Sequence, residues 1–159
     1  MSTISKPRYS PAEVLPHAAP MILLDEIVDY DEQSLTAALT VPADGFFNDA
    51  ALAGEVPAYV AIEYMAQAVA ALSGCRARAR GEAPKIGFLL GTRAFDSNVA
   101  SFKPGIRLTV SVNEMIQGDN GMGVFDARVS GHLADGSDIV VSARINGFQP
   151  PNPEAFLAA

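Results

Sequence analysis

The chain has 159 residues, 49% of them apolar and 18% charged, which predicts one globular domain over 1–159 and excludes a disordered or fibrous chain. The net charge of −7 argues against nucleic acid or an anionic membrane as the main partner. One cysteine and two histidines leave little material for a disulfide framework or a metal site. The polar start MSTISKPRYS predicts no secretory signal and, by default, a cytoplasmic location. Segments 1–9 and 150–159 are expected to be loosely held tails.

The first third of the sequence predicts one helical turn and two strands. Ser10 to Glu13 has the form of a helix start, with a serine cap, a proline at the first helical position and a glutamate that completes a capping box. Pro16 limits this helix to a single turn. The apolar run from Met21 to Val28 predicts the first strand, and the alternation from Leu35 to Val41 predicts the second.

A long helix is expected over 57–79. Pro57 suits its first turn, and Gly81 ends it. Its sequence is apolar on nearly all sides, as expected of a helix enclosed by other structure. The length would suit a membrane span, but Glu63 and Gln67 lie near its centre, and a carboxylate within a bilayer is costly. We therefore expect a buried helix and no membrane partner.

The rest of the chain predicts four strands. They cover 86–95, 106–113, 125–130 and 141–146, with hairpin turns at 118–121 and 135–137. Two strands before the long helix and four after it predict an α+β chain with the hot-dog fold, an antiparallel sheet wrapped around one long central helix. Sheets of this kind usually pair edge to edge as dimers.

Glu63 is the first candidate for chemistry. In a buried helix its carboxylate would lose hydration, which favours the protonated form and suits general acid or base catalysis. The alternative is a structural hydrogen bond to Gln67, one turn on. At the start of the same helix, the backbone N–H groups of Ala58 and Tyr59 are candidates for polarising a carbonyl oxygen. His17 is either a base or a structural histidine.

Arg76, Arg78 and Arg80 form the only dense basic cluster. They either complement the negative end of the helix dipole or form a docking patch for an acidic partner. The sequence indicates neither a metal nor an organic cofactor.

Three motifs resemble those of the hot-dog 3-hydroxyacyl-(acyl carrier protein) dehydratases, the FabA/FabZ-like family. Leu15-Pro16-His17 followed by Pro20 to Asp25 resembles the family's opening L-P-H-x-x-P-x-x-L-x-D. Pro57 to Gln67 resembles its helix motif P-G-x4-E-x-M-A-Q, and Phe102 to Gly105 resembles a shortened F-x-x-P-x-x-P-G stretch. The likeness runs from about Leu15 to Phe148.

The resemblance implies a dimer with acyl tunnels at the subunit interface. Glu63 matches the helix carboxylate, which in the family works with a histidine to remove water from a 3-hydroxyacyl thioester. Ala58 stands where the family has its carbonyl-binding glycine, and Tyr59 and Gln67 are further substrate-binding candidates. An acyl carrier protein or coenzyme A would deliver the substrate, with the arginine cluster serving a carrier protein. The partner subunit would be a second copy or a related dehydratase.

The family's catalytic histidine lies in a G-H-F-P motif that this sequence lacks. The corresponding stretch runs from Phe47 to Leu52, with Asp49 near the place of the histidine. A divergent subgroup, the ApeP-like proteins that accompany aryl polyene synthesis, also lacks it, and this chain resembles that subgroup most. His17 is then the candidate substitute, and Phe46 and Phe47 either gate the tunnel or belong to the core.

Three hypotheses for function follow. The first is a dehydratase (a lyase) of fatty-acid or aryl polyene synthesis, with His17 as base, Glu63 as acid and the Ala58 N–H on the thioester oxygen. The second is a hot-dog thioesterase that uses the helix carboxylate as a base for water. The third is an inert acyl-binding chain that completes a heterodimer with a competent dehydratase.

Overall fold

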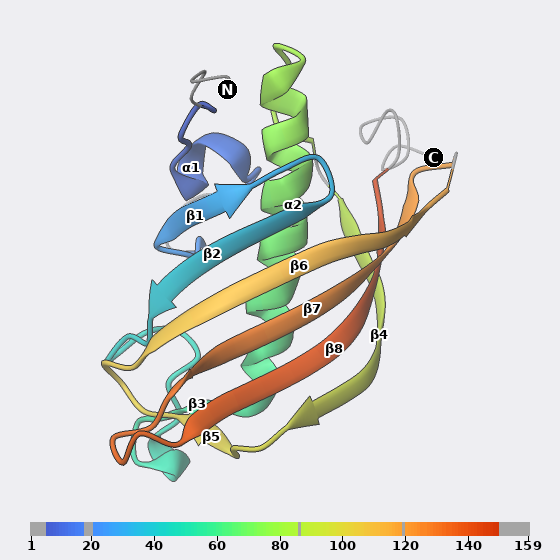
Figure 1. Cartoon of the computed structure of the whole chain (residues 1–159). Helices are drawn as coiled ribbons and strands as arrows, with labels where there is room; N and C mark the ends of the chain where they lie inside the picture. The colour runs from blue at the N-terminus through green and yellow to red at the C-terminus, as the bar shows by residue number, and fades with distance from the viewer. Residues whose placement is uncertain (1–5, 18–20, 86, 119, 150–159) are drawn as a thin grey trace.

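The computed structural model describes residues 6–17, 21–85, 87–118 and 120–149. Its main parts are a six-stranded antiparallel sheet and the long helix α2 (Ala61–Ala79), as Figure 1 shows. The sheet order is β1 (Glu26–Tyr30), β2 (Ser34–Thr40), β6 (Arg107–Gln117), β7 (Met122–His132), β8 (Asp138–Phe148) and β4 (Phe88–Ser97). The expected two strands before the helix and four after it are confirmed.

Several smaller elements complete the described fold. A two-stranded pair that the sequence did not suggest, β3 (Val56–Pro57) with β5 (Ser101–Phe102), lies beside the start of the helix (Figure 1). A 3-10 turn, Ala58–Val60, leads directly into α2, and a second, Ala50–Leu52, lies in the loop before it. None of the described helices combines the length and hydropathy needed to cross a membrane.

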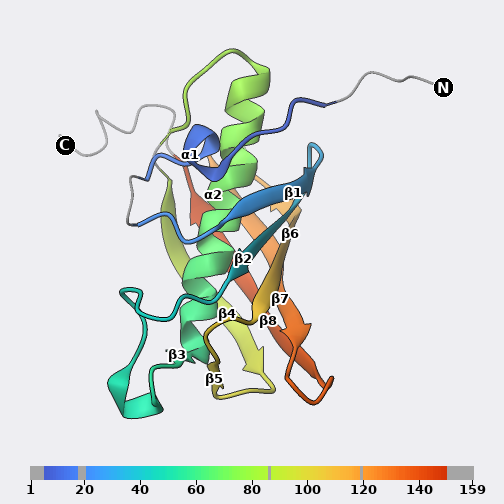
Figure 2. The same ribbon diagram turned by 90° about the vertical axis from the view of Figure 1, so that its left-hand side faces the viewer.

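The core lies between α2 and one face of the sheet (Figure 2). Met65, Ala68 and Leu72 of α2 are fully buried, as are Leu39 and Val110 of the sheet. Such burial contributes roughly 1.5–3 kcal/mol for each large apolar side chain.

The expectation that α2 is enclosed on all sides is wrong for the single chain. The sheet covers one side of the helix, helix α1 (Pro11–Val14) packs against its C-terminal half, and Figure 2 shows much of the remaining side uncovered. There, Glu63 is exposed, Ile62 and Val69 are half-buried, and Tyr59, in the preceding turn, is 65% exposed. An apolar face left open in this way is typical of a surface that another chain covers.

The first strand begins later than expected, at Glu26 instead of Met21. The reason is a side chain on α2. The Gln67 amide accepts a hydrogen bond from the Leu23 N–H (2.8 Å) and donates one to the Met21 carbonyl. These backbone groups are therefore bound to the helix, and sheet pairing starts only beyond them.

The predicted capping box of helix α1 (Pro11–Val14) is present, with Ser10 and Glu13 bonded reciprocally. The segment before it is held more firmly than expected. Lys6 pairs with Asp29 at 2.6 Å, and the hydroxyl of Tyr30 donates to the Pro7 carbonyl at 2.6 Å. Residues 6–9 thus lie against β1, while 1–5 and 150–159 fall outside the described residues.

The predicted C-terminal end of the long helix and the turns of two hairpins are confirmed. The start of the helix is not at Pro57 as expected, because a 3-10 turn precedes it and the α-helix begins at Ala61. Gly81 has a φ of +74°, and the Glu82 N–H returns to the Ala77 carbonyl at 2.8 Å. Gly121 and Gly136 take φ values of +87° in the turns of the β6–β7 and β7–β8 hairpins. Asp119 and the expected strand residue Ile86 lie outside the described residues.

Candidate active site

One cavity of about 380 Å³ runs beside α2. The helix residues that line it extend from Glu63 to Arg76, a rise of about 20 Å at 1.5 Å per residue. Strands β6, β7 and β8 supply other walls, together with Lys85, Gly87 and Leu89. His17 joins them from the segment after α1. Between Glu63 and Arg76, the part of α2 that lines the cavity includes the small apolar side chains of Ala66 and Ala70.

His17 and Glu63, 46 positions apart in the sequence, line this same cavity. Both are exposed in the single chain, so the expected burial of Glu63 is wrong. Neither makes a hydrogen bond or ion pair to another of the described residues. The two candidate catalytic groups therefore line the same cavity, and their polar atoms are available to a substrate.

Gln67 is buried, at 5% exposure, and holds the Met21–Leu23 backbone as described above. Its side chain also lines the cavity. The alternative of a structural pair with Glu63 is not formed, because the amide is engaged elsewhere. Gln67 therefore binds the backbone of Met21 and Leu23 to α2.

The Ala58 N–H does not face the cavity as the carbonyl-binding group that we expected. It donates to the Ala100 carbonyl at 2.9 Å, in continuation of the β3–β5 pair. A donor that is already bonded is not free to hold a thioester oxygen. Tyr59, the other expected donor, is not among the residues that line the cavity either.

Phe46, Phe47 and Asp49 are not among the residues that line the cavity. The Asp49 carboxylate accepts a hydrogen bond from the Ala51 N–H at 2.9 Å and thereby caps the 3-10 turn that follows. Phe46 is 81% exposed and contacts Phe47 edge-on, with ring centroids 5.1 Å apart. Phe47 packs against the core, so only Phe46 is free to move without disturbing it.

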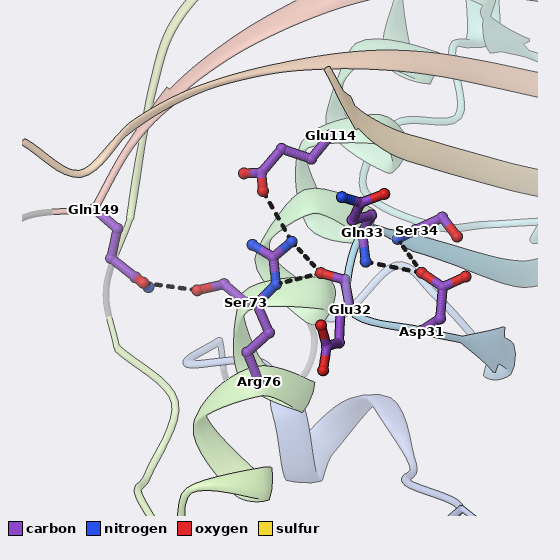
Figure 3. Close-up of polar contacts among 8 residues, drawn as sticks. All are labelled: Asp31, Glu32, Gln33, Ser34, Ser73, Arg76, Glu114 and Gln149. Atoms are coloured by element: carbon purple, nitrogen blue, oxygen red, sulfur yellow. Dashed lines mark hydrogen bonds and ion pairs between the residues drawn. The ribbon is translucent and has the colours of Figure 1, made fainter. Parts of the chain in front are cut away.

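The arginine cluster does not act as one patch. Figure 3 shows Arg76 turned inward, where it pairs with Glu114 of β6 at 2.9 Å and donates to the Glu32 carbonyl. Arg78 donates to the Glu13 carbonyl at 2.8 Å, and Arg80 lies 3.5 Å from Glu82. Only Arg78 and Arg80 are exposed, so a docking role for Arg76 is wrong for this conformation.

Sequence reasoning missed the polar residues at the far end of the cavity. Ser73 donates to Gln149 at 2.7 Å, and Glu114 meets Arg76 there (Figure 3). These partners are 76 and 38 positions apart, and no local pattern indicates such pairs. No group of three or more His, Cys, Asp or Glu side chains within the described ranges is arranged to hold a metal ion.

A family model described as ApeP-like, ApeP dehydratase, matches residues 9–158. The chain belongs to the ApeP-like dehydratase family. The dehydratase resemblance of the sequence motifs is thereby confirmed, including the subgroup. Among curated proteins, no match to this ApeP-like chain was found.

Solved structures confirm the hot-dog fold. A chain of the dehydratase heterocomplex ApeI:P from Xenorhabdus doucetiae is 31% identical, with a TM-score of 0.81, over 94% of this chain and 97% of that one. A hypothetical thioesterase from Streptococcus pneumoniae TIGR4, solved with coenzyme A, is 13% identical, with a TM-score of 0.55, over 78% and 84%. The PaaI protein of E. coli is 15% identical, with a TM-score of 0.53, over 78% of each chain. The last two share the fold alone with the ApeP-like chain.

Proposed function

We propose that this ApeP-like dehydratase removes water from a 3-hydroxyacyl thioester to give the trans-2-enoyl thioester, in fatty-acid or aryl polyene-type synthesis. In this proposal, His17 and Glu63 are the catalytic residues. The observation that carries the assignment is that both side chains line one cavity. No other histidine lines it among the described residues. The small apolar residues between its two ends suit an acyl chain.

The elimination needs one base and one acid on the same substrate. His17 takes a proton from C2, the C2–C3 double bond forms, and the C3 hydroxyl leaves as water with a proton from Glu63. The start of α2 is where the thioester oxygen is held. Positive partial charge at a helix start stabilises the enolate-like charge that develops on that oxygen.

The substrate carrier and the partner subunit belong to the same proposal. The similar ApeI:P structure is a heterocomplex of dehydratases, and we extend this to a heterodimer of the present chain with a related dehydratase. Strand β4 is a free edge of the described sheet and exposes Leu89, Leu90 and Phe95. Arg78 and Arg80 are the exposed cations for an acyl carrier protein, which would deliver the thioester in preference to coenzyme A.

The test is enoyl-thioester formation from a 3-hydroxyacyl carrier protein, with free thiol followed in the same reaction. We expect Glu63→Gln and His17→Ala each to lower kcat at least about 100-fold, the usual contribution of a general acid or base. His132→Ala and Glu26→Gln are matched controls, because both side chains are exposed and neither lines the cavity.

Each other outcome contradicts one part of the assignment. Loss in Glu63→Gln alone would remove His17 from the chemistry. Thiol release without enoyl product would mean a thioesterase. No product of either kind, from the chain alone and with its dehydratase partner, would mean an inert acyl-binding subunit.

A further inference from the structure

The cavity has two unlike ends. At the end with Glu63 and His17 both side chains are exposed. At the other end the side chain of Glu114 is only 9% exposed and that of Arg76 24%. The Arg76–Glu114 pair therefore covers the cavity about 20 Å along α2 from the exposed side chains of the proposed catalytic pair.

The polar side chains at this far end bind one another. Ser73 donates to Oε1 of Gln149 at 2.7 Å, and Nε2 of Gln149 donates to the Lys85 carbonyl at 3.1 Å. The Gln149 backbone N–H donates to Gly121 at 3.0 Å. Gln149 thus joins α2, the segment before β4 and the β6–β7 turn, and Figure 3 shows its bond to Ser73.

The Arg76–Glu114 pair, beside this tie, resists displacement. Arg76 also donates to the Glu32 carbonyl through Nε at 2.8 Å, so its guanidinium joins α2 to the β1–β2 turn. An apolar chain end that reached this point would have to separate a partly desolvated ion pair without replacing its bonds, which is strongly unfavourable.

We propose that the Ser73–Gln149 hydrogen bond and the Arg76–Glu114 ion pair form the distal wall of the acyl cavity and set the longest acyl chain that is accepted. This inference rests on the proposed function, because it assumes that the acyl chain extends from Glu63 along α2. Ser73 and Gln149 are the specificity-determining residues, since their bond can be removed without unpairing a buried charge.

The experiment compares kcat/KM across 3-hydroxyacyl carrier proteins of increasing chain length, with the chain in complex with its dehydratase partner if it requires one. In Gln149→Ala we expect the ratio of long-chain to short-chain kcat/KM to rise about tenfold, the effect of one or two methylenes that no longer clash. Ser73→Ala removes only one hydroxyl and should shift the ratio in the same direction. This second variant tests the proposal even if Gln149→Ala does not fold. Gln33→Ala, in an exposed turn, is the matched control.

A length profile that stays unchanged in both folded variants would overturn the proposal. A shift in favour of chains with a polar end, rather than of longer chains, would also overturn it, because the site would then recognise a functional group. If the wild type forms no enoyl product at any length, the proposed function fails on its own. The length limit is then measured as the Kd of the same acyl series by displacement of a fluorescent fatty acid, with the same variants and the same expected shift.

Discussion

Gln67 illustrates how a single residue decides the local path of the chain near the site. Its amide binds Leu23 and Met21, which lie 44 and 46 positions before it, and thereby fixes the segment that follows His17. In the sequence, Gln67 lies one helical turn after Glu63, so a local hydrogen bond between the two side chains was one expectation. The actual partners are distant in sequence, so helix periodicity alone does not reveal them.

We expect Gln67→Leu to lower the free energy of unfolding by about 2–4 kcal/mol, because the Leu23 N–H and the Met21 carbonyl would lose their partner in a half-buried place. Chemical denaturation at equilibrium measures this loss. Gln33→Leu, at an exposed position, should stay within about 0.5 kcal/mol of the wild type. A Gln67→Leu protein as stable as the wild type would mean that these two hydrogen bonds are absent in solution.

At the scale of elements, the packing of α1 against α2 depends on one glycine. A Cβ on Gly74 would lie 1.8 Å from the Val14 carbonyl oxygen, far inside contact distance. The two helices therefore approach through the backbone of α2. The sequence shows Gly74 as an interruption in a helix, and only the packing explains it.

We expect Gly74→Ala to lower the free energy of unfolding by about 2 kcal/mol or more, because overlap with α1 outweighs the higher helix propensity of alanine. Gly91→Ala is the control, since a Cβ there meets no atom within 4 Å and its φ is not in the left-handed region. Thermal or urea denaturation of both variants and the wild type measures the two changes in the free energy of unfolding. Equal stability of the two would show that α1 moves aside without cost.

At the scale of the molecule, the open side of α2 and the free edge of β4 indicate a surface that a second subunit covers. An exposed apolar edge strand is a template for pairing with another sheet, which natural proteins avoid unless the edge is used. We expect Leu90→Lys, in β4, to prevent this association, because a charge would be buried between the paired edges.

Size-exclusion chromatography with light scattering measures this prediction, with the chain alone and mixed with the proposed dehydratase partner. Leu90 is 53% exposed, so Leu90→Lys should leave the Tm of the isolated chain within a few degrees of the wild type. Val140→Lys is the control, because Val140 is 42% exposed on β8, a strand that is paired on both sides within the sheet. Association that survives Leu90→Lys would place the subunit contact elsewhere.

The sequence by itself determined the elements and the family. Alternation of apolar residues, the Ser10 capping box and the Gly81 helix end are local patterns, and the three motifs carried the dehydratase resemblance. Tertiary structure alone decided how the site is built. It left Glu63 exposed, bonded the Ala58 N–H to Ala100, and turned Arg76 inward to Glu114. The physical reason is the same in each case: these contacts join residues far apart in the chain, and their burial depends on how the helix meets the sheet.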